Sequence, residues 1–153
     1  EANIGVLDLS LVANHLRELV FIEADGAAPN NRLGGLEAPK WQTSFDATWR
    51  MNEWTVNYGW NWFDKTRRYS RATMEASPNI APPAYMYYNA KSSHDLQVRY
   101  QADERFTLYA GVNNLTDQRP DPNSFDYPIS AMGRFFYVGL NARMATIGEL
   151  FGR

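Results

Sequence analysis

The sequence predicts an all-β fold, specifically an antiparallel segment of a transmembrane β-barrel. Six stretches alternate apolar and polar residues at period two, which is typical of strands with one apolar and one polar face. The connections between these stretches alternate between long and short, and Trp, Tyr and Phe gather near both ends of the stretches. Outer-membrane barrels combine all three features, because short turns lie on the periplasmic side, long loops lie outside, and aromatic belts mark both membrane boundaries.

The first half of the chain contains three of the expected strands. Residues 5–16 place leucines on one face, and a Gly/Pro/Asn-rich segment at 26–35 then predicts a long loop. Residues 41–49 and 54–62 both alternate, with tryptophans on the apolar face. Only residues 51–53 separate these two stretches, so we expect a hairpin.

The second half contains the other three strands. Residues 64–93 hold three prolines and a basic patch without sustained periodicity, which predicts a second long loop. The stretches after it alternate again, with Met144 as the last expected strand residue. In chain order we expect a strand at 94–100, a turn at 102–105, a strand at 106–113, a third long loop at 116–132 and a strand at 135–144.

Composition excludes several classes of protein. The chain has 153 residues, the length of one domain, and its mean hydropathy is −0.50. No run of about 18 apolar residues exists, which excludes a transmembrane helix. A net charge of −2 without a basic stripe makes nucleic acid an unexpected partner. Cysteine is absent, which removes disulfides and thiol chemistry.

Because the chain begins at Glu1, we expect a processed product or a fragment whose signal peptide is removed or lies upstream.

The aromatic residues of the expected strands fall at two levels, as the membrane-interface belts of a barrel do. The short-turn end carries Trp49, Trp54, Tyr100 and Phe106, and the long-loop end carries Trp41, Trp60, Trp62 and Phe136. Alternation alone does not say which way the apolar face points, so a soluble β-sandwich or lipocalin-like barrel remains an alternative. Six strands are too few to close a barrel, and open edges cannot be satisfied in lipid. The membrane hypothesis therefore predicts part of a larger barrel.

Two segments resemble a known family. Residues 109–117, Tyr-Ala-Gly-Val-Asn-Asn-Leu-Thr-Asp, are similar to the penultimate-strand signature of TonB-dependent outer-membrane receptors. Residues 133–140, Gly-Arg-Phe-Phe-Tyr-Val-Gly-Leu, resemble the last-strand signature of the same family. Two departures are Thr116, where the family usually has an aromatic, and the residues that follow Met144, where the family normally ends at an aromatic.

The resemblance implies a 22-stranded barrel in the bacterial outer membrane, filled by an N-terminal plug. Residues 1–144 would form its C-terminal part and 145–153 a tail. Such receptors bind a scarce small-molecule nutrient, such as siderophore-bound iron, cobalamin or an oligosaccharide, and the TonB complex supplies energy through a segment near the N-terminus. The implied partners are the lipid bilayer, lipopolysaccharide, the rest of the barrel with its plug, and TonB. Binding and gating need no covalent chemistry and no cofactor.

The residues offer no catalytic or metal constellation. His15 and His94 are far apart and lack the spacing of metal ligands or of a triad. Residues 121–126 carry oxygen ligands without the Gly and Glu of an EF-hand, and Asn114 begins a three-residue glycosylation match better explained by its place at a strand end. The remaining charged residues of the polar faces predict a hydrogen-bonded network against the plug: Asp8, Asp46, Asp95, Arg99 and Arg143.

The second long loop carries the best candidates for nutrient binding. Its cations would attract an anionic ligand, and its tyrosines would stack on a sugar or chelate ring. The alternative is a solvated loop whose charges meet lipopolysaccharide. Two other functions also remain open, a soluble carbohydrate-binding module and a passive porin-like barrel. The candidate ligand-binding residues are Lys65, Arg67, Arg68, Tyr69, Tyr85, Tyr87 and Tyr88.

Overall fold

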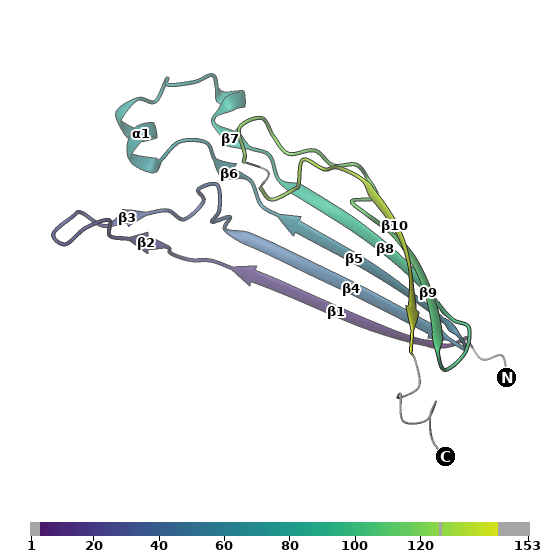
Figure 1. Ribbon diagram of the computed structural model, residues 1–153. Coiled ribbons are helices and arrows are strands. Elements are labelled where there is room, and N and C mark those ends of the chain that lie inside the picture. Colours follow the sequence, from purple (N-terminus) through teal and green to yellow (C-terminus); the bar gives the residue numbers. More distant parts are fainter. Residues whose placement is uncertain (1–3, 126, 144–153) are drawn as a thin grey trace, which may run out of the picture.

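Six long strands form one antiparallel sheet in the computed structural model, which describes residues 4–125 and 127–143 (Figure 1). Each strand pairs with the next long strand along the chain, so the sheet is a simple up-and-down meander. All six predicted strands are present. In sheet order they are β1 (Val6–His15), β4 (Trp41–Met51), β5 (Trp54–Phe63), β8 (Lys91–Gln101), β9 (Phe106–Asn113) and β10 (Phe135–Ala142).

The long connections contain short elements that the sequence did not reveal. We call these connections loop A (residues 16–40), loop B (residues 64–90) and loop C (residues 114–134). Loop A pairs β2 (Val20–Phe21) with β3 (Asn30–Asn31), and loop B pairs β6 (Thr66–Arg67) with β7 (Tyr87–Tyr88). Between β6 and β7 lie α1 (Arg71–Ala76) and a 3-10 turn, η1 (Pro83–Tyr85). No helix in the described part of the chain is long and apolar enough to cross a membrane.

The prediction of one long loop from 64 to 93 therefore needs correction in two respects. Short hairpin strands and a helix occupy part of it, and β8 begins at Lys91 rather than at His94. Lys91 and Ser92 pair with Phe63 and Trp62 of β5 through their backbones. Because polar side chains occupy both of these positions, the strand extension leaves no apolar alternation in the sequence.

The register divides the sheet into one apolar and one polar face. A single row across the six strands contains Leu9, Ala47, Tyr58, Leu96, Val112 and Phe136. The adjacent row contains Ser10, Asp46, Gly59 and Asp95. The apolar face has no cover within the described residues, since Leu9 is 62% exposed and Val138 is 82% exposed.

The sheet is open, and its connections sort by length between its two ends. Within the described residues, β1 pairs only with β4 and β10 pairs only with β9. The short β4–β5 and β8–β9 turns lie at the end where β1 begins and β10 ends, whereas loops A, B and C gather at the opposite end (Figure 1). An uncovered apolar face and two free edges are the properties expected of one part of a larger barrel.

Candidate functional site

A chain of hydrogen bonds crosses the polar face along one register row. The Thr48 hydroxyl donates to Asn57 Oδ1 at 2.9 Å, and Asn57 Nδ2 donates to Gln97 Oε1 at 3.4 Å. Gln97 Nε2 then donates to the hydroxyl of Tyr137 at 3.1 Å, passing over Gly111 of β9. These contacts link four of the strands through uncharged side chains, which satisfies polar groups without placing charge on the wall.

Two glycines of this face give room to tyrosines on the neighbouring strand. Gly111 pairs with Tyr137, and Gly139 pairs with Tyr109. A Cβ at Gly111 would collide with the phenol of Tyr137, and a Cβ at Gly139 would collide with that of Tyr109. The centroids of the two rings are 6.3 Å apart, and the ring planes are tilted by 56° to each other. The glycines of both signature segments are therefore needed for close packing between β9 and β10.

Only some of the charged residues that were predicted to form a hydrogen-bonded network on this face have a side-chain bond. Asp8 forms an ion pair with Arg50, and Asp95 Oδ1 accepts a hydrogen bond from the backbone N–H of Asn114 at 2.7 Å. Asp46, Arg99 and Arg143 have no side-chain hydrogen bond within the described residues. A hollow of about 310 Å³ lies over this part of the face, with Asp46 and Asp95 among its lining residues.

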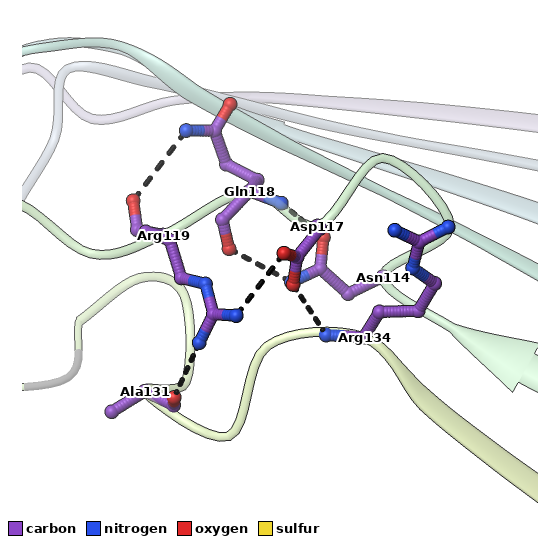
Figure 2. Close-up of polar contacts among 6 residues, drawn as sticks. All are labelled: Asn114, Asp117, Gln118, Arg119, Ala131 and Arg134. Atoms are coloured by element: carbon purple, nitrogen blue, oxygen red, sulfur yellow. Dashed lines mark hydrogen bonds and ion pairs between the residues drawn. The ribbon is translucent and has the colours of Figure 1, made fainter.

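A second cluster joins the two ends of loop C, next to β9 and β10 (Figure 2). Asp117 accepts hydrogen bonds from the backbone N–H of Arg134 at 2.8 Å and from Arg119 Nη2 at 3.1 Å. These bonds, first of all the one from Arg134, hold the pKa of Asp117 below its usual value of 3.8. Gly133 has φ +71, and a Cβ there would lie 2.7 Å from both Asp117 and Arg119. The two resembling segments thus meet in space.

Asn114 closes the same cluster on the β9 side. Its side-chain oxygen accepts from the backbone N–H of Gln118, and its amide donates to the Gln118 carbonyl, both at 2.8 Å (Figure 2). Asn114 is 8% exposed and has φ 53, a left-handed conformation that asparagine tolerates better than most residues. The residue therefore stabilises the strand end, as its position in the sequence predicted.

Arg67 joins loop B to loop A. Its backbone N–H donates to the carbonyl of Gly34 and its Nη2 donates to the carbonyl of Leu33, each at 2.6 Å. Its other terminal nitrogen, Nη1, is buried and has no hydrogen-bond partner among the described residues. Burial, followed by the charge of Arg71, lowers the pKa of Arg67 from its usual value. An unpaired guanidinium nitrogen out of solvent costs free energy.

Arg68 joins loop B to loop C. Its guanidinium donates to the carbonyls of Tyr87 at 3.2 Å and Pro122 at 3.0 Å, and it lies 4.2 Å from the centroid of the Tyr88 ring. The Tyr88 hydroxyl donates to the carbonyl of Asn123 at 2.6 Å. Arg68 and Tyr88 therefore hold the two loops together.

A nearly buried ion pair reinforces this junction. Lys91 Nζ lies 2.9 Å from Asp121 Oδ1, with the two side chains 9% and 12% exposed. The other carboxylate oxygen of Asp121 accepts from the backbone N–H of Asn89 at 2.7 Å. Burial works to raise the pKa of Asp121, but the bonds from Lys91 and Asn89 hold it below 3.8. We call the contacts of Asp121, Pro122 and Asn123 with loop B and Lys91 the loop clip.

Two hollows lie between the loops, with volumes of about 460 and 530 Å³, and Arg67 and Arg71 line both. The smaller hollow is also lined by Lys40, Lys65 and Tyr87. The larger hollow is also lined by Arg32, Arg68, Tyr69 and Phe125. Of the predicted ligand-binding residues, only Tyr85 and Tyr88 lie outside both linings. Sequence reasoning missed Arg32, Lys40 and Arg71, although their positive charge in long loops was a usable signal.

Comparison with known proteins agrees with this geometry. The family model described as TonB dependent receptor-like, beta-barrel, matches residues 2–115, which is most of the chain. The chain belongs to this family. Comparison with curated protein sequences gave no match.

Solved receptors show the same strand arrangement. The ferric-catecholate import receptor Fiu of Escherichia coli K12, in a closed form, is similar at a TM-score of 0.57 and 12% identity over 90% of this chain. A point mutant of the ferric enterobactin receptor PfeA of Pseudomonas aeruginosa, in complex with enterobactin, gives 0.57 and 17% over 89%. The chain spans 19% and 20% of those receptors' lengths. At these identities the likeness shows the fold, an antiparallel segment of a barrel wall.

Membership in the TonB-dependent receptor family assigns the two faces of the sheet. The apolar face is the outer surface of the barrel and the polar face lines its lumen. On the outer face, Trp54 and Tyr100 lie opposite each other near the short turns with ring centroids 4.7 Å apart, and Trp41 lies near the loops. The eight predicted interface aromatics all lie on this face by register, and their role as membrane belts stays a prediction.

Both histidines of this barrel segment also lie on the outer face. His15 stacks on Trp41 at 4.2 Å, and His94 Nδ1 lies 2.7 Å from the hydroxyl of Tyr58. Within the described residues, no group of three or more His, Cys, Asp or Glu side chains is arranged to hold a metal ion. The expected end of β10 at Met144 and the tail at 145–153 lie outside the described residues.

Proposed function

We propose that this chain is the C-terminal wall and loop region of an outer-membrane receptor that takes up an anionic metal chelate, of the ferric siderophore class, by TonB-dependent transport. The receptor binds its ligand at loops A and B and carries out no covalent chemistry. A plug and a TonB-engaging segment from the rest of the protein complete it. Residues 1–144 form the barrel part and 145–153 a tail.

The basic hollow between loops A and B is the observation that carries this proposal. Its lining contains four cations, Lys40, Lys65, Arg67 and Arg71, against two carboxylates, Asp64 and Glu75, so positive charge is in excess around this space. Tyr87 supplies an aromatic surface there, 5.3 Å from the Lys65 ammonium. Clustered cations of this kind favour an anion over a neutral sugar. The similarity of the fold to two receptors for ferric catecholates supports the choice of ligand class.

The test uses the full-length receptor and ferric enterobactin as the probe. Binding is measured by fluorescence quenching with Arg67→Gln, Arg71→Gln and the double variant. Each charge-assisted contact that is lost should weaken binding by about tenfold or more, since such contacts are worth roughly 1.5–3 kcal/mol. The matched control is Arg105→Gln, an exposed arginine in the turn at the opposite end of the sheet, which should leave affinity unchanged.

Uptake of ⁵⁵Fe by cells separates active transport from passive flow. Cells that carry the receptor should lose uptake when the TonB complex is deleted, and they should retain surface binding. Uptake that persists without TonB would favour a passive barrel, whereas equal affinity in Arg67→Gln and wild type would reject the hollow as the ligand site.

A further inference from the structure

Phe125 stands out among the loop residues because it is both strained and exposed. It has φ 53, a left-handed conformation that bulky side chains rarely adopt, and Asn123 two residues earlier has φ 63. The residue is 87% exposed, the highest value among the exposed large hydrophobic residues of the described chain. Left-handed bulky residues persist where the surrounding structure forces them, and they concentrate at binding sites.

The surrounding structure does force the turn that presents Phe125. The loop clip holds residues 121–123, just before it. Lys91 and the Asn89 N–H bind the carboxylate of Asp121. The Pro122 carbonyl accepts a hydrogen bond from Arg68, and the Asn123 carbonyl accepts one from Tyr88. Ser124 is 2% exposed, so the turn is packed up to the residue that precedes Phe125. Loop C accordingly lies beside the β7 end of loop B (Figure 1). Phe125 itself lies outside this packing.

Phe125 lies at the larger basic hollow. Phe125 lines that hollow together with Arg67, Arg71 and Tyr69, although it comes from a different loop. The structure therefore combines positive charge from loop B with an apolar aromatic surface from loop C in one space. A simple oxyanion would use only the charge, whereas an anion that carries flat aromatic rings would use both.

We propose that Phe125 is a specificity-determining residue that selects anions with aromatic rings at this site. The ring stacks on the ligand while Arg67 and Arg71 bind its charged oxygens, and Asp121 is the positioning residue that holds the turn. This inference rests on the proposed function, because it uses the same anion site. It adds to the proposed function a residue, Phe125, that was not among the predicted ligand-binding residues. It also requires that the ligand carry aromatic rings.

A matched pair of probes isolates the aromatic contribution. Chromium(III) tris-catecholate and chromium(III) tris-oxalate are both substitution-inert trianions of similar shape, and only the first has aromatic rings. The full-length receptor in detergent is titrated with each probe. We expect Phe125→Ala to weaken tris-catecholate binding roughly tenfold and to leave tris-oxalate binding unchanged, while Phe125→Trp restores the preference. Arg67→Gln should weaken both.

Asp121→Asn tests the positioning role with a nearly isosteric side chain. It should reproduce the selective loss of tris-catecholate affinity, and the double variant Asp121→Asn/Phe125→Ala should be no weaker than Phe125→Ala alone, because the two residues act through one contact. Additive effects would mean that Asp121 does not act through Phe125.

The outcomes distinguish this inference from the proposed function. If both probes bind and Phe125→Ala affects neither, or both equally, the specificity role is wrong while the anion site stands. If neither trianion binds the wild-type receptor, the anion site itself fails and the role of Phe125 fails with it. Preferential binding of tris-catecholate that disappears in Phe125→Ala supports both.

Discussion

The wall and the loops of this receptor segment are held together by different kinds of contact. In the wall, each strand pairs with its neighbour through a continuous backbone ladder, and the side chains follow from the two-residue period. In the loops, a few long-range side-chain contacts fix the arrangement, above all those of Arg67, Arg68 and Asp121. Many weak, repeated interactions build the first region, and a few specific ones build the second.

The largest expected effect follows from placing a charge on the outer face of the wall. Val138→Arg puts a guanidinium near the middle of β10 on the lipid-facing side, which costs about 2–4 kcal/mol at the bilayer midplane. Folding of the full-length receptor into lipid vesicles, followed by heat-modifiable gel mobility and denaturant titration, measures this loss. Asn141→Arg, on the lumen face of the same strand, is the control and should fold nearly as wild type. Equal losses in both variants would contradict the assignment of faces.

Breaking the loop clip should cause the second largest destabilisation, and it should not destabilise the six-stranded sheet. Asp121→Ala leaves Lys91 nearly buried without a partner, and we expect local destabilisation of about 2 kcal/mol. Hydrogen exchange should rise in loop C and at Asn89 but not along β8. Glu23→Ala, which removes an exposed ion pair with Arg32 in loop A, should change exchange little. Loss of protection throughout the sheet would show that wall and loops unfold together.

The same contrast explains how far the sequence could predict the structure. The strands were predicted because alternation reports directly on which face each residue occupies, and the start of β9 at Phe106 and the start of β4 at Trp41 were both correct. Lys91 was missed as a strand residue because it pairs with Phe63 through the backbone, and its polar side chain does not continue the apolar alternation. The ion pair between Lys91 and Asp121 has no local pattern, since it joins residues that only the folded loops bring together.

The candidate site shows this difference residue by residue. Charge and aromatic content were enough to nominate Lys65, Arg67 and Tyr87, which line the smaller hollow. Composition could not show that the guanidinium of Arg68 donates to backbone carbonyls, nor that Phe125 of loop C would line the larger hollow. Residues 121–126 were expected to form a polar loop without a metal, but the sequence could not show that the carboxylate of Asp121 would bind Lys91 and the Asn89 N–H.

Glycine substitutions in the lumen face give a smaller and more local test. Gly139→Ala places a methyl group against the Tyr109 ring, and we expect about 1–2 kcal/mol of destabilisation from this overpacking. Gly59→Ala is the matched control on the same face, because its Cβ would meet Asp46 at 3.6 Å and Asp95 at 3.9 Å, which are ordinary contacts. Denaturant titration of both variants should separate them. Equal stability would mean that the tyrosine rings of β9 and β10 move aside freely.

Acid should loosen the loops and leave the wall in place, with no effect near neutral pH. The pKa of Asp121 in the docked loop is lower than the 3.8 of a free carboxyl, so its carboxylate favours docking above that value. This contribution is lost only as the pH falls below 3.8 and through the lower pKa of the docked state, because protonation then removes the charge that binds Lys91. The hydrogen-exchange protection factors of loop C, which are corrected for the intrinsic pH dependence of amide exchange, should therefore be constant from pH 8 to about 5 and fall below pH 4. In Asp121→Asn the protection of loop C should lose most of its dependence on acid. An unchanged acid response in that variant would assign the transition to another carboxyl. Asp117, at the base of loop C, is the alternative carboxyl with a lowered pKa.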